Sequence, residues 1–68
     1  MRIVKDRQGN QLHPGDQVYR PGEFTPTKVL AIDSYRMRPV QVQMGWHRVN
    51  EVLTPATRWY RGDQLEVV

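Results

Sequence analysis

TKVLAIDSYRMRPVQVQM, residues 27–44, is the stretch that decides the fold of this 68-residue chain. Residues 27–35 are mostly apolar or β-branched, and this composition predicts a strand. Residues 36–38 form the expected turn. From residue 39 to 44, apolar and polar side chains alternate, as they do in a strand with one buried face. The two runs together predict a β-hairpin.

The first strand of this hairpin has apolar side chains on both of its faces. Leu30 and Ile32 are expected to share one face, and Val29 and Ala31 the other. Such a strand either bends across a barrel or is covered on both sides. A second copy of the chain packing against it, which gives a homo-oligomer, is one way to cover it.

The remainder of the chain consists of short runs between turn signals. Five prolines and five glycines are spread along the sequence and separate these runs. Further strands are predicted at residues 2–5, 17–20, 58–60 and 65–68. Residues 46–52 fit either a strand or an ordered loop, and the only helical alternative is a turn or two near residues 48–53, ended by Pro55. The prediction is one all-β domain over residues 1–68, a small, roughly five-stranded barrel with no substantial helix, whose closure hides the strand edges.

Four short segments give the chain the layout of a known superfamily. They are Gly15-Asp16-Gln17-Val18, residues 28–33, Val40-Gln41-Val42 and residues 64–68. In this order they resemble the SH3-like barrels, which include the KOW-type nucleic-acid-binding modules, a small photosystem subunit and the type II plasmid dihydrofolate reductases. The resemblance implies the fold and no single function, because one small fold hosts many functions.

Size and composition narrow the class of protein. A chain of this length forms one domain with a small core, which leaves little volume for an enclosed catalytic pocket. It has no cysteine, so neither a disulfide nor a thiolate metal site can form. No apolar run approaches the roughly 20 residues that span a bilayer. We therefore expect a soluble, cytoplasmic protein without membrane association.

No constellation of side chains indicates catalysis, a metal site or a cofactor. His13 and His47 are far apart and have no metal-ligating neighbours at a suitable spacing. The single serine, Ser34, has no histidine nearby in the sequence to activate it. The chain is therefore expected not to be an enzyme. The acids in turn contexts, whose carboxylates are expected to bond backbone N–H groups, are Asp6, Asp16 and Asp63.

The region from residue 35 to 61 carries the strongest functional signal. It holds five arginines and a single acid, Glu51, in a chain whose net charge is +3. Aromatic and imidazole side chains are interleaved with the arginines. Arginine contacts phosphate, and flat rings stack on unpaired bases. The candidate binding residues are Arg36, Arg38, Trp46, Arg48, Arg58 and Arg61.

Nucleic acid, either RNA or DNA, is the leading partner predicted for this region. In a barrel, the turn at residues 36–38 is expected to lie close to residues 46–48, so that both share one face. Trp46 is expected to be exposed, whereas Trp59 or Tyr60 is expected to be largely buried. The alternative is a protein–protein interaction module, an adaptor or modulator of a larger complex, because tryptophan, tyrosine and arginine also dominate protein interfaces.

Overall fold

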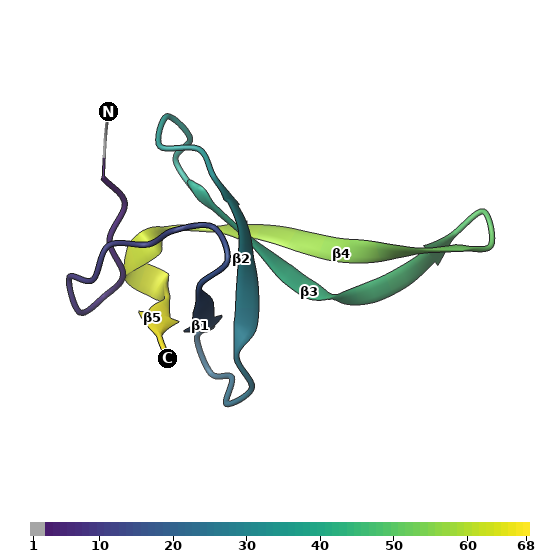
Figure 1. The fold of residues 1–68 in the computed structure, drawn as a ribbon, viewed down its shortest axis with the longest axis horizontal. Helices are drawn as coiled ribbons and strands as arrows, with labels where there is room; N and C mark the ends of the chain where they lie inside the picture. The colour runs from purple at the N-terminus through teal and green to yellow at the C-terminus, as the bar shows by residue number, and fades with distance from the viewer. Residues whose placement is uncertain (1–2) are drawn as a thin grey trace.

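The fold is an open, bent antiparallel β-sheet of five strands (Figure 1). The computed structural model describes residues 3–68. The strands are β1 (Gln17–Tyr19), β2 (Thr27–Ile32), β3 (Val40–Val49), β4 (Val52–Tyr60) and β5 (Glu66–Val67), and a 3₁₀ turn, η1, spans Gly62–Gln64. Their order across the sheet is β4-β3-β2-β1-β5, so β4 and β5 are its two edges.

This architecture confirms the predicted all-β class with five strands. The sheet is not closed, because β4 and β5 do not pair, and it is a barrel only in a loose sense. In the described part of the chain, η1 is the only helical segment, and no helix there is long and apolar enough to cross a bilayer. The helical alternative for residues 48–53 is wrong, because they form the ends of two paired strands and the turn between them. Of the strand predicted at residues 2–5, Arg2 lies outside the described residues and Lys5 makes an isolated bridge to Gln11.

A small apolar core lies on one face of the sheet. Its buried side chains are Leu12, Val18, Val29, Val40, Val42 and Leu65. The alternation predicted for β3 places Val40 and Val42 inward, with Gln41 between them on the other face. Leu12 and Leu65 come from opposite ends of the chain, so the core is complete only when both ends are packed in place.

A β-bulge in β2 changes which of its side chains face the core. Val29 lies opposite Val42 and Ile32 lies opposite Val40, so β2 has one extra residue between these two pairs. Val29 and Ile32 therefore face the core together, although residues three apart in a regular strand point to opposite faces. The expected grouping of Leu30 with Ile32 on one face is wrong for this reason.

Past the rest of the sheet, β3 and β4 continue as a two-stranded ribbon, which we call the arm (residues 45–56). It projects from the body in Figure 1 and gives the molecule extents of 40 × 27 × 18 Å. At its tip, Val49 pairs with Val52 across Asn50 and Glu51, whose φ angles are 49° and 66°. Two residues with positive φ make a type I′ turn, whose twist matches that of the paired strands.

Two residues that resemble strand breakers are accommodated in the arm. Gly45 follows the alternating run of residues 39–44, a place that predicts the end of that strand. It instead adopts a φ of 117° at a second bulge, where Met44 is the extra residue between Gln43 and Gly45. Pro55 lies opposite Trp46. Counted from the tip, hydrogen-bonded and non-hydrogen-bonded pairs alternate, which places Pro55 in a non-hydrogen-bonded pair with its nitrogen at the open edge of β4. Its missing N–H therefore costs no bond to β3.

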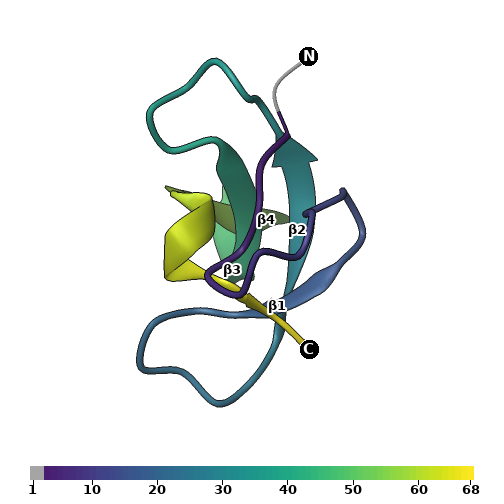
Figure 2. The same ribbon diagram turned by 90° about the vertical axis from the view of Figure 1, so that its left-hand side faces the viewer.

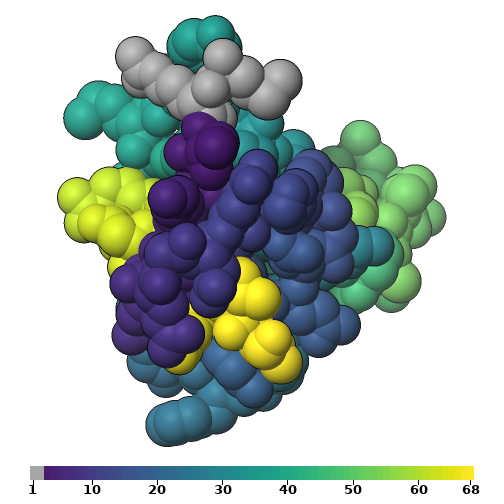
Figure 3. Space-filling view, turned by 60° about the vertical axis from the view of Figure 1, so that its left-hand side comes forward, coloured from purple at the N-terminus to yellow at the C-terminus, as the bar shows by residue number. Residues whose placement is uncertain are grey.

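The segment around Asp6 and the C-terminal β5 lie at the end of the molecule opposite the arm tip (Figure 1), where they are side by side (Figures 2 and 3). The buried carboxylate of Asp6 accepts hydrogen bonds from the backbone N–H groups of Val67 (2.9 Å), Asn10 (2.7 Å) and Gln8 (3.0 Å). Burial alone raises the pKa of Asp6, but these bonds, with one from the Asn10 side chain, outweigh burial and hold the pKa below its ordinary value of 3.8. The bond to Val67 joins the N-terminal segment to β5.

Gly62 makes a second close contact between the C-terminal and N-terminal segments of the chain. It is buried in η1, where a Cβ would overlap the backbone carbonyl oxygen of Lys5 and lie 2.9 Å from Cγ1 of Val4. The Gly62 carbonyl accepts a hydrogen bond from the N–H of Leu65 at 3.0 Å. The close approach of Gly62 to the N-terminal segment therefore also sets the position of the buried Leu65.

Candidate nucleic-acid interface

The three strands β2, β3 and β4 contain no acidic residue. They carry three cationic side chains, Lys28, Arg48 and Arg58. Between residues 34 and 62 the only acid is Glu51, in the turn at the arm tip. The larger part of the sheet therefore presents positive charge with almost no negative charge beside it.

Both tryptophans lie on the outer face of the sheet, away from the core. Side chains alternate between the two faces along β4, and Tyr60 packs against the core. Trp59 therefore points outward, and so does Pro55 four residues earlier. Trp46 is the pairing partner of Pro55, and directly opposed residues share a face. Arg48, two residues further along β3, shares the outer face with Trp46.

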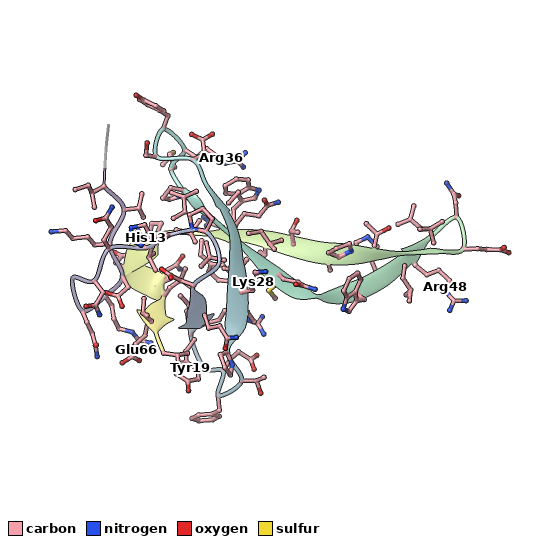
Figure 4. All side chains as sticks on the ribbon, in the orientation of Figure 1. His13, Tyr19, Lys28, Arg36, Arg48 and Glu66 are labelled. Carbon is pink, nitrogen blue, oxygen red and sulfur yellow. The ribbon has the colours of Figure 1, made fainter. Side chains whose placement is uncertain are left out.

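Arg36, which is labelled in Figure 4, follows β2 in the β2–β3 turn and stacks on Trp59. Its guanidinium carbon lies 3.9 Å from the centre of the Trp59 ring, well within the range of a cation–π contact. The stacked guanidinium is a flat, positively charged plane, and bases stack on such planes as they do on aromatic rings. The pair therefore combines a stacking surface with a charge.

A shallow hollow of about 700 Å³ opens beside this pair. It is lined by Arg36, Met37, Arg38, Arg58 and Trp59. No acid lines the hollow, and none of the ion pairs found among residues 3–68 involves its three arginines. Arg58 lies 6.0 Å from the ring centre of Tyr60. Arginines without acidic partners around one hollow suit a phosphate group, which a guanidinium binds through two parallel N–H bonds.

Arg61 differs from the other predicted binding residues because an acid neutralises it. Its Nε lies 3.3 Å from Oδ1 of Asp63, in the segment that leads from β4 into η1. A similar ion pair joins Arg7 to Glu66 at 3.5 Å. Arg61 is therefore a poorer candidate for phosphate contact than the arginines of the hollow.

The predicted site divides into two parts that lie far apart. Arg36 and Arg48 are at opposite ends of the β3–β4 hairpin in Figure 4, so the predicted proximity of the two segments is wrong. The reason is that residues 46–48 extend into the arm instead of folding back over the sheet toward residues 36–38. Trp46 is 62% exposed, as predicted. Trp59 and Tyr60 are both half-buried, Tyr60 against the core and Trp59 beneath Arg36.

The histidines and acids of the described residues form no group of three that could share a metal ion. His13 instead lies beside Asp16, with its Nδ1 3.8 Å from Oδ2. The Asp16 carboxylate also accepts a hydrogen bond from the backbone N–H of His13 at 2.8 Å, which is the turn role predicted for this acid.

The fold and the site together define a small all-β domain in which the outer face of β3 and β4 bears arginine and tryptophan and lacks acids. No family model, curated protein or solved structure matches the chain. The side chains and their geometry are therefore the basis on which a function can be proposed.

Proposed function

We propose that the protein is a non-enzymatic module that binds single-stranded RNA or DNA along the outer face of β3 and β4. The observation that carries this proposal is the row formed by Arg36 on Trp59, then Trp46, then Arg48, on strands without an acid. Proteins that bind single strands combine aromatic stacking platforms with a positively charged path for the backbone. Both components occur here on one face.

The spacing along this face suits a chain of several nucleotides. Trp59 and Pro55 are four residues apart on β4, and Trp46 lies opposite Pro55. At about 3.3 Å per residue, the two rings are separated by roughly 13 Å along the strand. Unpaired bases can stack at each ring while the intervening backbone stays extended. The hollow around Arg38 and Arg58 lies at one end of the row and receives a phosphate.

Binding is expected to be strongly salt-dependent and to favour single strands over duplex. Phosphate contacts release counterions, so the affinity falls as the salt concentration rises, whereas stacking needs unpaired bases. Fluorescence anisotropy with labelled single-stranded and duplex oligonucleotides, between about 50 and 200 mM salt, measures both properties. The absence of binding at the lowest salt would show that the proposal is wrong.

Replacing Arg36 and Arg38 together by glutamine is expected to weaken binding about 30-fold near 0.1 M salt. The slope of log affinity against log salt should also become shallower by about 0.7 for each lost phosphate contact. The matched control is the double variant Arg7→Gln with Arg61→Gln, which removes the same charge from arginines already paired with acids. Equal effects of the two double variants would mean that only net charge matters and that the hollow is not a site.

A further inference from the structure

The arm exposes more apolar surface than a two-stranded ribbon can stabilise alone. Trp46, Val49, Val52 and Leu53 are 62%, 47%, 63% and 61% exposed, and they occupy both faces of the ribbon. An isolated hairpin is only marginally stable in water. The whole chain of 8.0 kDa exposes 5020 Å², whereas a folded chain of this mass exposes about 4,500 Å². The exposed apolar side chains of the arm are therefore available to a partner.

One edge of the arm is open to another strand. Within the described residues, β2 pairs with β3 only as far as Val42, so residues 46–49 have β4 on one side and no strand on the other. Counted from the tip, Trp46 and Arg48 are in non-hydrogen-bonded pairs with β4, so their backbone N–H and C=O groups point to this open edge. The opposite edge of the arm, on β4, is interrupted by Pro55.

We propose that a second copy of this chain pairs with the open edge of β3, antiparallel and across a two-fold axis, with His47 opposite His47 of the second copy. In this register Trp46 lies opposite Arg48 of the other copy on the outer face, so a ring meets a guanidinium across the junction. Val49 lies opposite Gly45, where the absence of a side chain leaves room. The groups that point to the open edge at Trp46 and Arg48 then bond to their counterparts.

This register carries the tip of one arm to a hollow at the base of the other. The hollow, of about 320 Å³, lies where β2 and β3 diverge, and Arg20, Lys28 and Gly45 are among the residues that line it, with no acid. The Nε atom of Arg20 is buried without a hydrogen-bond partner, and its Nη1 contacts the Met44 sulfur, a weak acceptor, at 2.9 Å. Lys28 is labelled at this position in Figure 4. The cationic side chains of Arg20 and Lys28 therefore have no carboxylate beside them in the lining of this hollow.

Glu51 at the arm tip is a carboxylate that complements this cationic lining. It is the only acid of the arm, it is exposed, and it occupies a turn position with a φ of 66° at which glycine is favoured. A two-fold axis makes the contact reciprocal, because each copy inserts its own Glu51 beside Arg20 and Lys28 of the other. The same two-fold arrangement pairs the open edge of β3 and places the Glu51 carboxylate beside Arg20 and Lys28. A second copy of the chain is therefore the occupant that fits both features.

The proposed interface is modest in size. It consists of one short run of paired strand, residues 45–49 of each copy, with a docked arm tip at either end. The dimer should therefore be weak and depend on concentration. Its formation needs no nucleic acid, so it does not rest on the proposed function.

The register can be tested with a single cysteine, because the chain contains none. In the variant His47→Cys the two thiols lie directly opposite each other across the axis, within the distance at which a disulfide forms. We expect this variant to form a disulfide-linked dimer at least ten times faster than Val49→Cys, which has the same strand and face but no symmetric counterpart. Equal rates, or no cross-link in either variant, would overturn the register.

The docking of the tip is tested by sedimentation equilibrium of the full chain without nucleic acid. The wild type is expected to dimerise below about 1 mM, and Glu51→Lys to weaken the dimer at least tenfold. Glu51→Gly should weaken it as well, although glycine suits the turn better, because the carboxylate is lost. Asp63→Lys is the control with the same change in charge. A monomeric wild type, or equal effects of the Glu51 and Asp63 variants, would contradict the proposal.

Discussion

Replacing Gly62 by alanine is expected to reduce the free energy of unfolding by about 3 kcal/mol, a large part of the total for a domain of this size. The added Cβ would overlap the carbonyl oxygen of Lys5. Backbone atoms cannot move aside as the end of a flexible side chain can, so either η1 or the N-terminal segment has to shift. Either shift disturbs Leu65, which is completely buried in the core.

Chemical denaturation followed by tryptophan fluorescence measures this loss. The effect is steric, because the φ of Gly62 does not lie in the left-handed region. Asp63→Ala, in the same turn but exposed, is the matched control, and it should cost less than about 1 kcal/mol because it removes only a surface ion pair with Arg61. A Gly62→Ala variant as stable as this control would mean that η1 does not press against the N-terminal segment.

Removal of the Asp6 carboxylate should have a comparable effect. In Asp6→Ala, the backbone N–H groups of Gln8, Asn10 and Val67 lose their acceptor, and the expected loss of stability is about 3 kcal/mol. Asp6→Asn keeps one oxygen but turns an amide N–H₂ group toward N–H donors, so it should lose about 2 kcal/mol. Urea denaturation at neutral pH ranks the two variants, and an unchanged Asn variant would show that the carboxylate charge is unimportant.

The pKa of Asp6 gives this contribution a definite dependence on pH. Because the pKa is lower in the folded state than its ordinary value of 3.8, the contribution is fully present above pH 3.8. It is lost as the pH falls through the folded-state pKa, where the carboxylate gains a proton. Asp6→Asn should therefore remove part of the acid sensitivity of unfolding. Glu23→Gln, at an exposed position, should leave that sensitivity nearly unchanged, and equal pH profiles for the two variants would contradict the assignment.

The sequence pattern predicts the centre of the sheet well and the arm poorly. The alternation of Val40 and Val42 predicts the first half of β3 because one face of that segment is buried. Gly45 and Pro55 indicate interruptions, yet a bulge absorbs the glycine and an open edge tolerates the proline. The turn at the arm tip also cannot be predicted from the sequence, because Glu51 occupies the position where a type I′ turn usually has glycine. The arm depends on these exceptions.

The candidate site is predicted in part. The run of arginines with interleaved rings identifies the region, and an exposed Trp46 follows from its place after a glycine. The contact between Arg36 and Trp59 cannot be read from the sequence, because it joins residues 23 positions apart through the pairing of three strands. Asp6 is a similar case. Its bonds to Gln8 and Asn10 follow from the local turn, whereas its bond to Val67 spans 61 residues.

Pro55 has a consequence for association on a larger scale. A two-stranded sheet with both edges unpaired can pair with a further copy at each edge. Such pairing can continue without limit, as it does in amyloid fibres. Only the β3 edge of this arm can accept a strand, because the proline ring stands where β4 would otherwise offer a donor. In the proposed two-fold dimer the β3 edges of both arms are paired, so neither arm keeps an uninterrupted edge for a third copy. Pro55 therefore disfavours strand addition at the β4 edge of a hairpin rich in exposed apolar side chains.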